Sequence, residues 1–180
     1  MVRNRGIFIC NIIITMSNVH PLVIHFPIAL LSLYVIIECL SLFSQKIRNM
    51  FFTSKLLLLF VGTVWTLTAL RSWEAAEDIL WESSLIYTHS EIAEQTYTIF
   101  VILSIIYLVY LLAGKRFIPY YKSLQEKLYT ILSSRWMKIC ITILALYGFA
   151  LLIITGSLGA AITHGPDIDP IVQFIYNLFL

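Results

Sequence analysis

The sequence has 180 residues, of which 59% are apolar and 12% are charged, with a net charge of +2. This composition argues against a soluble globular domain and favours an integral membrane protein. The small net charge, and the lack of a basic run with interleaved aromatic residues, argue against nucleic acid as a partner. We therefore expect the lipid bilayer to surround most of the chain.

The first fifteen residues imitate part of a signal peptide. Arg3 and Arg5 precede the apolar run GIFICNIIIT, but no small-residue cleavage pattern follows, and this run of roughly ten residues is too short to span a bilayer. Two interpretations stay open: an N-terminal segment of the protein, or upstream translation before a true start at Met16. We keep 1–15 apart from the membrane domain, which we expect over 18–168.

Four later stretches have the length and apolarity of spanning helices, each close to the roughly 20 residues that a bilayer requires. They cover residues 21–44, 56–73, 96–114 and 138–162. The third helix is expected to begin well before its apolar run, because no helix breaker stands in LIYTHSEIAEQTYTIF. The sequence therefore predicts an all-α fold, an integral membrane four-helix bundle of up-and-down topology.

The first span opens with HPLVIHFPIALL, in which each histidine is followed closely by a proline. Pro21 suits the first turn of a helix, where its missing N–H costs nothing. Pro27 removes the hydrogen bond to the carbonyl of Val23, which predicts a kink that turns His25 into the bundle. An ordinary proline kink without a functional role is the alternative.

The charges of the connecting segments predict the orientation of the bundle. Nine of the twelve basic residues lie in two connections, as Lys46, Arg48 and Lys55, then Lys115, Arg116, Lys122, Lys127, Arg135 and Lys138. The connection between the second and third spans is acidic. Because an excess of Lys and Arg marks the cytoplasmic side, we expect both termini on the extracytoplasmic side. Glu38, inside the first span, is expected to snorkel or to pair with a boundary lysine.

All four histidines are predicted to lie in one layer. Counting from the basic boundary, 26 residues lead to His20, 21 to His25, 25 to His89 and 26 to His164. At about 1.5 Å per helical residue, these counts place the histidines roughly 31 to 39 Å from that boundary. Three helices would thus bring imidazoles together near the outer face, where ionisable groups are often functional.

The fourth span carries small residues at a spacing of four. Gly148, Gly156 and Ala160 share one helix face with Leu152 and His164. Such a stripe lets a neighbouring backbone approach closely. The alternative is that it leaves a groove for a flat cofactor beneath His164.

Two further segments are predicted to be interfacial. Residues 117–136 place Phe117, Tyr121, Leu124, Leu128 and Ile131 on one apolar face, as in a helix that lies on a leaflet or against a partner. After His164 the sequence GPDIDP breaks the helix, and the tail over 169–180 is too short to span.

HPLVIHFPIALL, the acidic connection leading to THSEIA, and TGSLGAAITHG together resemble the bacterial membrane family called domain of unknown function 2231, over roughly residues 18–168. The resemblance implies a four-helix protein of the bacterial inner (cytoplasmic) membrane. It also implies a redox context, because some members are joined to or encoded near cytochrome-type domains. It marks His20, His25, His89 and His164 as the motif positions without assigning them a chemistry, and it differs where this chain has Gly-Ala in place of a Gly-Gly pair.

Three functions stay open from the sequence. The first is a b-type haem-binding electron-transfer subunit that works with redox partner subunits. Its axial ligands would come from the four histidines. His25 and His89 are favoured, because the first and third helices lie diagonally in such a bundle. The second is a zinc or copper site, formed by His20, His89 and His164 or with His25 among the ligands. The third is a non-catalytic assembly subunit whose histidines are structural.

Overall fold

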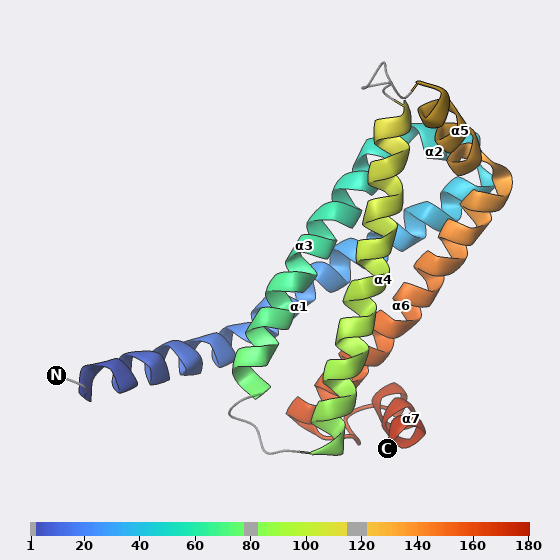
Figure 1. Ribbon diagram of the computed structural model, residues 1–180. Helices are drawn as coiled ribbons and strands as arrows, with labels where there is room; N and C mark the ends of the chain where they lie inside the picture. The colour runs from blue at the N-terminus through green and yellow to red at the C-terminus, as the bar shows by residue number, and fades with distance from the viewer. Residues whose placement is uncertain (1–2, 78–82, 115–121) are drawn as a thin grey trace.

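The chain is all-helical in its described parts (Figure 1). The computed structural model describes the backbone of residues 3–77, 83–114 and 122–180, and the side chains of 23–73, 83–114 and 123–180. No strand occurs in these ranges. The long helices are α1 (Arg3–Phe43), α3 (Phe52–Glu77), α4 (Ser84–Gly114) and α6 (Arg135–His164), and the short ones are α2 (Gln45–Met50), α5 (Lys122–Ser133) and α7 (Pro170–Phe179).

The four long helices indicate a multi-pass membrane protein. Each contains a segment long and apolar enough to cross a bilayer: Val23–Phe43, Phe52–Trp73, Ser84–Gly114 and Arg135–His164. Many of their large apolar side chains face outward, such as Val64 at 66% exposure and Ile143 at 61%. An apolar exterior of this size suits lipid, whereas a soluble monomer would expose much smaller patches. The prediction of an all-α fold with four helices long and apolar enough to span a membrane is confirmed.

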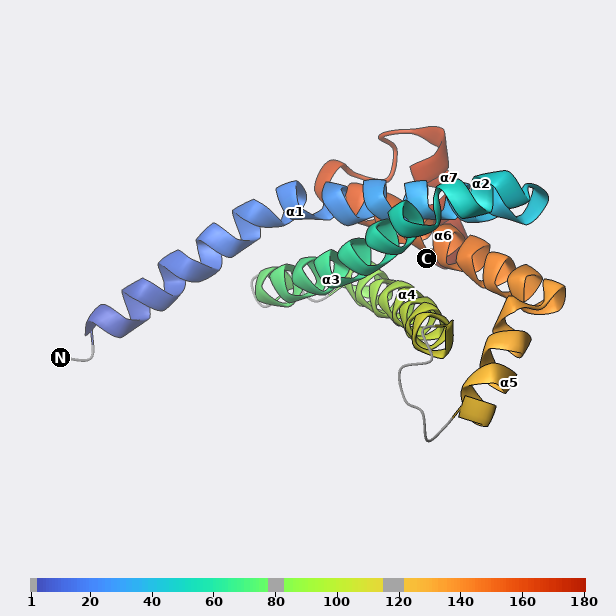
Figure 2. The same cartoon turned by 90° about the horizontal axis from the view of Figure 1, so that it is seen from above.

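Each of the four long helices packs against two of the others, and Figure 2 shows them from above. Helix α1 packs against α3 and α6, and α4 packs against the same two helices. Consequently α1 and α4 lie diagonally opposite each other, as the up-and-down topology predicts. The centre is filled by side chains that are fully buried: Leu31, Tyr34, Leu59, Phe100, Leu103 and Ala145.

Two glycines allow the helices to approach closely. A Cβ added at Gly62 of α3 would stand 2.7 Å from Cδ2 of Leu31 on α1. A Cβ at Gly148 of α6 would stand 2.9 Å from Cγ2 of Ile99 on α4. Without a hydrophobic driving force between helices in lipid, such close packing is a main source of association.

Several helix boundaries differ from the sequence-based ranges. Helix α1 begins at Arg3 and continues as one helix through Pro21 and Pro27, so it is much longer than the 21–44 span. Helix α4 begins at Ser84, which confirms an early start for the third helix. Residues 115–121, which include Phe117 and Tyr121 of the predicted interfacial segment, lie outside the described residues.

Short amphipathic helices form in both segments that were predicted to be interfacial. Helix α5 leaves Leu124 and Ile131 about half exposed. Helix α7 begins at Pro170, and the Asp169 carboxylate caps it by accepting from the N–H groups of Ile171 and Val172. It packs against α6 and buries Val172. This arrangement places α7 at the end of the bundle opposite α2 and α5 (Figure 1).

Candidate functional site: a histidine-lined cavity

A cavity of about 250 Å³ lies between the four long helices at the end of the bundle near α7. All four helices contribute to its wall. Most of the lining is apolar or small, with a few polar groups that converge on it, which is the usual make-up of a small-molecule site. The polar and aromatic lining residues are His25, Thr66, Trp73, His89, Thr96, Thr155, Thr163 and His164.

Three of the four predicted site histidines line this cavity. His25 comes from α1, His89 from α4 and His164 from the last turn of α6. His89 is buried at 6% exposure, whereas His25 and His164 are exposed and mark an open rim. The side chain of His20 lies outside the described residues.

The ring of His89 is fixed by two neighbours. The ring of Trp73 on α3 meets it edge-on, with centroids 4.5 Å apart and an angle of 71° between the planes. Trp73 is itself anchored, because its Nε1–H donates to Oγ of Ser90 at 2.7 Å. On the other side, a Cβ at Gly159 would stand 3.2 Å from Cε1 of His89. The missing side chain of Gly159 therefore makes room for this imidazole against α6.

Gly156 lines the cavity and, because it has no side chain, leaves space inside it. No atom lies within 4 Å of the position where its Cβ would stand. Nearby, the hydroxyl oxygens of Thr96 on α4 and Thr155 on α6 lie 3.1 Å apart and join these helices. The two alternatives for the stripe of small residues therefore both occur, at different positions along α6. Gly148 packs closely against α4, and Gly156 leaves open space in the cavity.

The described histidines could serve as ligands of a bound group, whereas His20, a ligand of the alternative metal site, lies outside the described side chains. Within the described ranges no group of three or more His, Cys, Asp or Glu side chains is arranged to hold a metal ion. His25 and His89 stand on diagonal helices that both line one cavity, and a neutral imidazole can bind haem iron or another metal ion. The enclosed volume is slightly below the roughly 300 to 1,000 Å³ of typical ligand pockets.

Sequence reasoning missed several residues that shape this cavity. Trp73 was not singled out from the sequence. It lies 18 residues after the boundary residue Lys55, and these residues span roughly 27 Å of helix. This depth is close to that predicted for His25. The same depth count that grouped the histidines would have found it. Thr96 and Thr155 carry no comparable signal, because threonines on apolar helices usually bond their own backbone, as both also do here.

Comparisons with known proteins give no match: no family model, curated protein or solved structure is significantly similar to this chain. The resemblance to the bacterial membrane family therefore stays a prediction from the sequence motifs.

Proposed function

We propose that this protein is a membrane subunit that binds a b-type haem with His25 and His89 as axial ligands and transfers electrons. The observation that carries the proposal is that His25, His89 and His164, from three different helices, line one cavity. The diagonal arrangement of α1 and α4 supports the choice of His25 and His89, because these two residues would hold the group from opposite sides of the cavity.

The residues of the chain would orient the group and limit its access to water. Trp73 and Gly159 fix the plane of the His89 ring from two sides. Gly156 leaves space for a flat ring against α6, and His164 stands at the rim as a second candidate ligand from that helix. Bound haem would supply a one-electron couple whose potential depends on the axial ligands and on burial.

The proposed orientation puts this cavity near the extracytoplasmic face of a bacterial inner membrane. The two connections rich in Lys and Arg adjoin the other end of the bundle, which the positive-inside rule assigns to the cytoplasm. Electrons would then pass between a donor within the membrane and an acceptor outside the cytoplasm. Redox partner subunits are part of this proposal.

Absorption spectroscopy tests the proposal. The protein is expressed with ample haem, purified in detergent and measured oxidised and reduced. A Soret band that shifts on reduction, and that the double substitution His25→Gln/His89→Gln abolishes, is the expected result. A wild-type spectrum without a Soret band would reject haem binding. Metal analysis of the same sample tests the alternative zinc or copper site, since either metal without porphyrin iron would favour that alternative.

A non-catalytic assembly subunit is the second candidate. It is favoured by the tight packing of His89 between Trp73 and Gly159, which is also typical of a structural core residue. It predicts that replacing His25, His89 and His164 together leaves both the fold and the cellular activity intact. Under the haem proposal the same triple variant folds but loses its spectrum and its electron transfer.

A further inference from the structure

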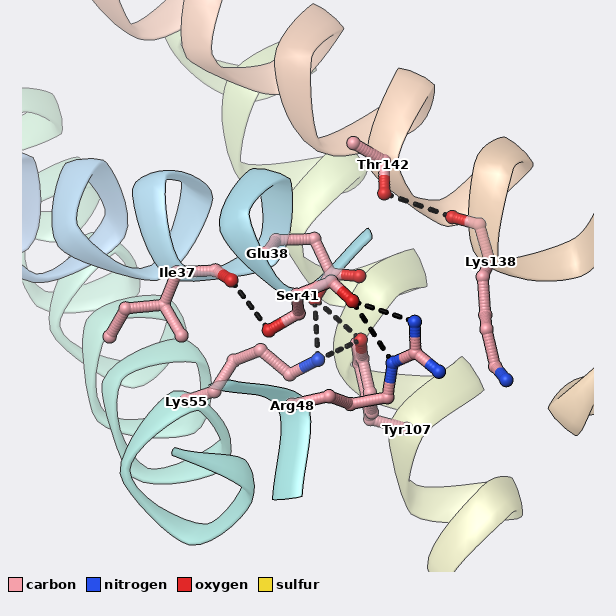
Figure 3. A network of polar contacts seen from close by, with 8 residues as sticks. All are labelled: Ile37, Glu38, Ser41, Arg48, Lys55, Tyr107, Lys138 and Thr142. Atoms are coloured by element: carbon pink, nitrogen blue, oxygen red, sulfur yellow. Dashed lines mark hydrogen bonds and ion pairs between the residues drawn. The ribbon is translucent and has the colours of Figure 1, made fainter. Parts of the chain in front are cut away.

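A second and larger cavity of about 560 Å³ lies at the opposite end of the bundle from the histidines. It is bounded by the ends of α1, α3, α4 and α6 together with α2 and α5. Among the described residues, three basic side chains and one acidic side chain line it: Arg48, Lys55, Lys138 and Glu38. Figure 3 shows these side chains from close by.

One of the three cations is already neutralised. The Nζ atom of Lys55 lies 2.7 Å from Oε2 of Glu38, and both side chains are about 5% exposed. The ammonium also donates to the hydroxyl of Tyr107 at 2.8 Å, and that hydroxyl donates to Glu38 at 2.6 Å. This closed triad forms a buried wall of the cavity without net charge.

Arg48 is bonded to the chain but keeps donors for a ligand. Its Nε and Nη2 donate to the carbonyl of Ser41 at 3.1 and 2.7 Å, and Nη1 donates to Gln45. A guanidinium group has five N–H donors. Because these contacts use three donors and no carboxylate neutralises the charge within the described residues, two N–H donors and a full positive charge remain.

Lys138 is the second cation of the cavity that lacks a counter-charge among the described residues. It lies in the first turn of α6 and is partly buried. Among the described residues its ammonium makes no ion pair and no hydrogen bond, and Figure 3 accordingly draws no interaction to it. An anion in the cavity would supply the counter-charge that Arg48 and Lys138 both lack among the described residues, and would thereby stabilise this arrangement.

We propose that this cavity binds a phosphate ester, with the phosphate held between Arg48 and Lys138. Arg and Lys both bind phosphate through charge-assisted hydrogen bonds, Arg with paired N–H donors and Lys as a compact charge. The volume is larger than a bare phosphate requires, and Leu111, Leu132 and Ile141 line it beside the polar groups, so an organic portion fits as well. A membrane phospholipid headgroup and a soluble phosphate ester share this chemistry.

Binding to the full chain in detergent tests the proposal. Short-chain phosphatidylglycerol and glycerol 1-phosphate are titrated separately, and affinity is followed by intrinsic tryptophan fluorescence. At least one probe should bind saturably, and Lys138→Gln should weaken it roughly tenfold, as expected for the loss of one charge-assisted hydrogen bond. Lys138→Arg should retain binding. The matched control is Lys127→Gln, which removes the same charge from an exposed position of α5 outside the cavity and should leave affinity unchanged.

The outcomes separate the two sources of phosphate. Saturation by phosphatidylglycerol alone identifies a lipid headgroup site, and equal affinity for glycerol 1-phosphate identifies a site for soluble esters. Two results would overturn the proposal: no saturable binding of either probe, or an equal loss of affinity in Lys138→Gln and Lys127→Gln. None of these results depends on haem binding at the other end of the bundle.

Discussion

Glu38 of α1 and Lys55 of α3 form an ion pair of 2.7 Å within the apolar interior of the bundle. Tyr107 of α4 completes the contact by hydrogen bonding to both partners. One polar cluster therefore joins three of the four long helices. It also lies beneath the cavity at the basic end, so it separates that cavity from the core.

Breaking this ion pair should destabilise the bundle strongly. Glu38→Gln leaves the Lys55 ammonium buried without its counter-charge, and we expect a loss of about 3 kcal/mol in the free energy of unfolding. Thermal unfolding in detergent measures the effect. Replacing both residues, as Glu38→Met/Lys55→Met, should cost much less than the single change, because no unpaired charge is left behind. A single variant as stable as the wild type would show that the pair contributes little.

The two glycines of the α6 stripe should respond in opposite ways to alanine. Gly148→Ala brings a Cβ to 2.9 Å from Ile99 and 3.2 Å from the buried ring of Phe100, so we expect a destabilisation of about 1 to 3 kcal/mol from overpacking. Gly156→Ala meets no atom within 4 Å and should leave stability unchanged or slightly raised. The two melting temperatures test the packing directly; equal effects would contradict it.

Filling the histidine cavity should block ligand binding without unfolding the protein. Gly156→Leu places a large apolar side chain at a cavity position where an added Cβ would meet no other part of the chain within 4 Å. We expect a normal melting temperature and a haem affinity reduced by at least roughly tenfold, or 1.4 kcal/mol. Gly156→Ala is the matched control. If the leucine variant binds haem as well as the control does, the ligand must lie elsewhere.

The helices and their relative depth were predictable from the sequence. The apolar stretches identify the spans because a bilayer fixes both their length and their composition. Counting helical residues from the basic boundary placed His25, His89 and His164 in one layer, and these three side chains line one cavity. The count works because every spanning helix rises by nearly the same distance per residue.

Contacts across helices were less predictable. Glu38 was expected either to snorkel or to pair with a boundary lysine, and the pairing is confirmed. Nothing in the sequence identified Lys55 or Tyr107 as its partners. The edge-on contact of Trp73 with His89 was missed for the same reason. Both depend on how each helix is rotated about its own axis, which uniformly apolar sequences scarcely encode. The basic residues Arg48 and Lys138 were interpreted only as signs of orientation, so the cavity between them was overlooked.

The most direct test of the central claim is a haem titration of the purified protein, followed by absorbance in the Soret region. The histidine-lined cavity predicts saturation at one haem per chain, the loss of this binding in His25→Gln/His89→Gln, and normal thermal unfolding of that double variant. Haem absorbance that never saturates, or that saturates equally in the double variant, would contradict the claim.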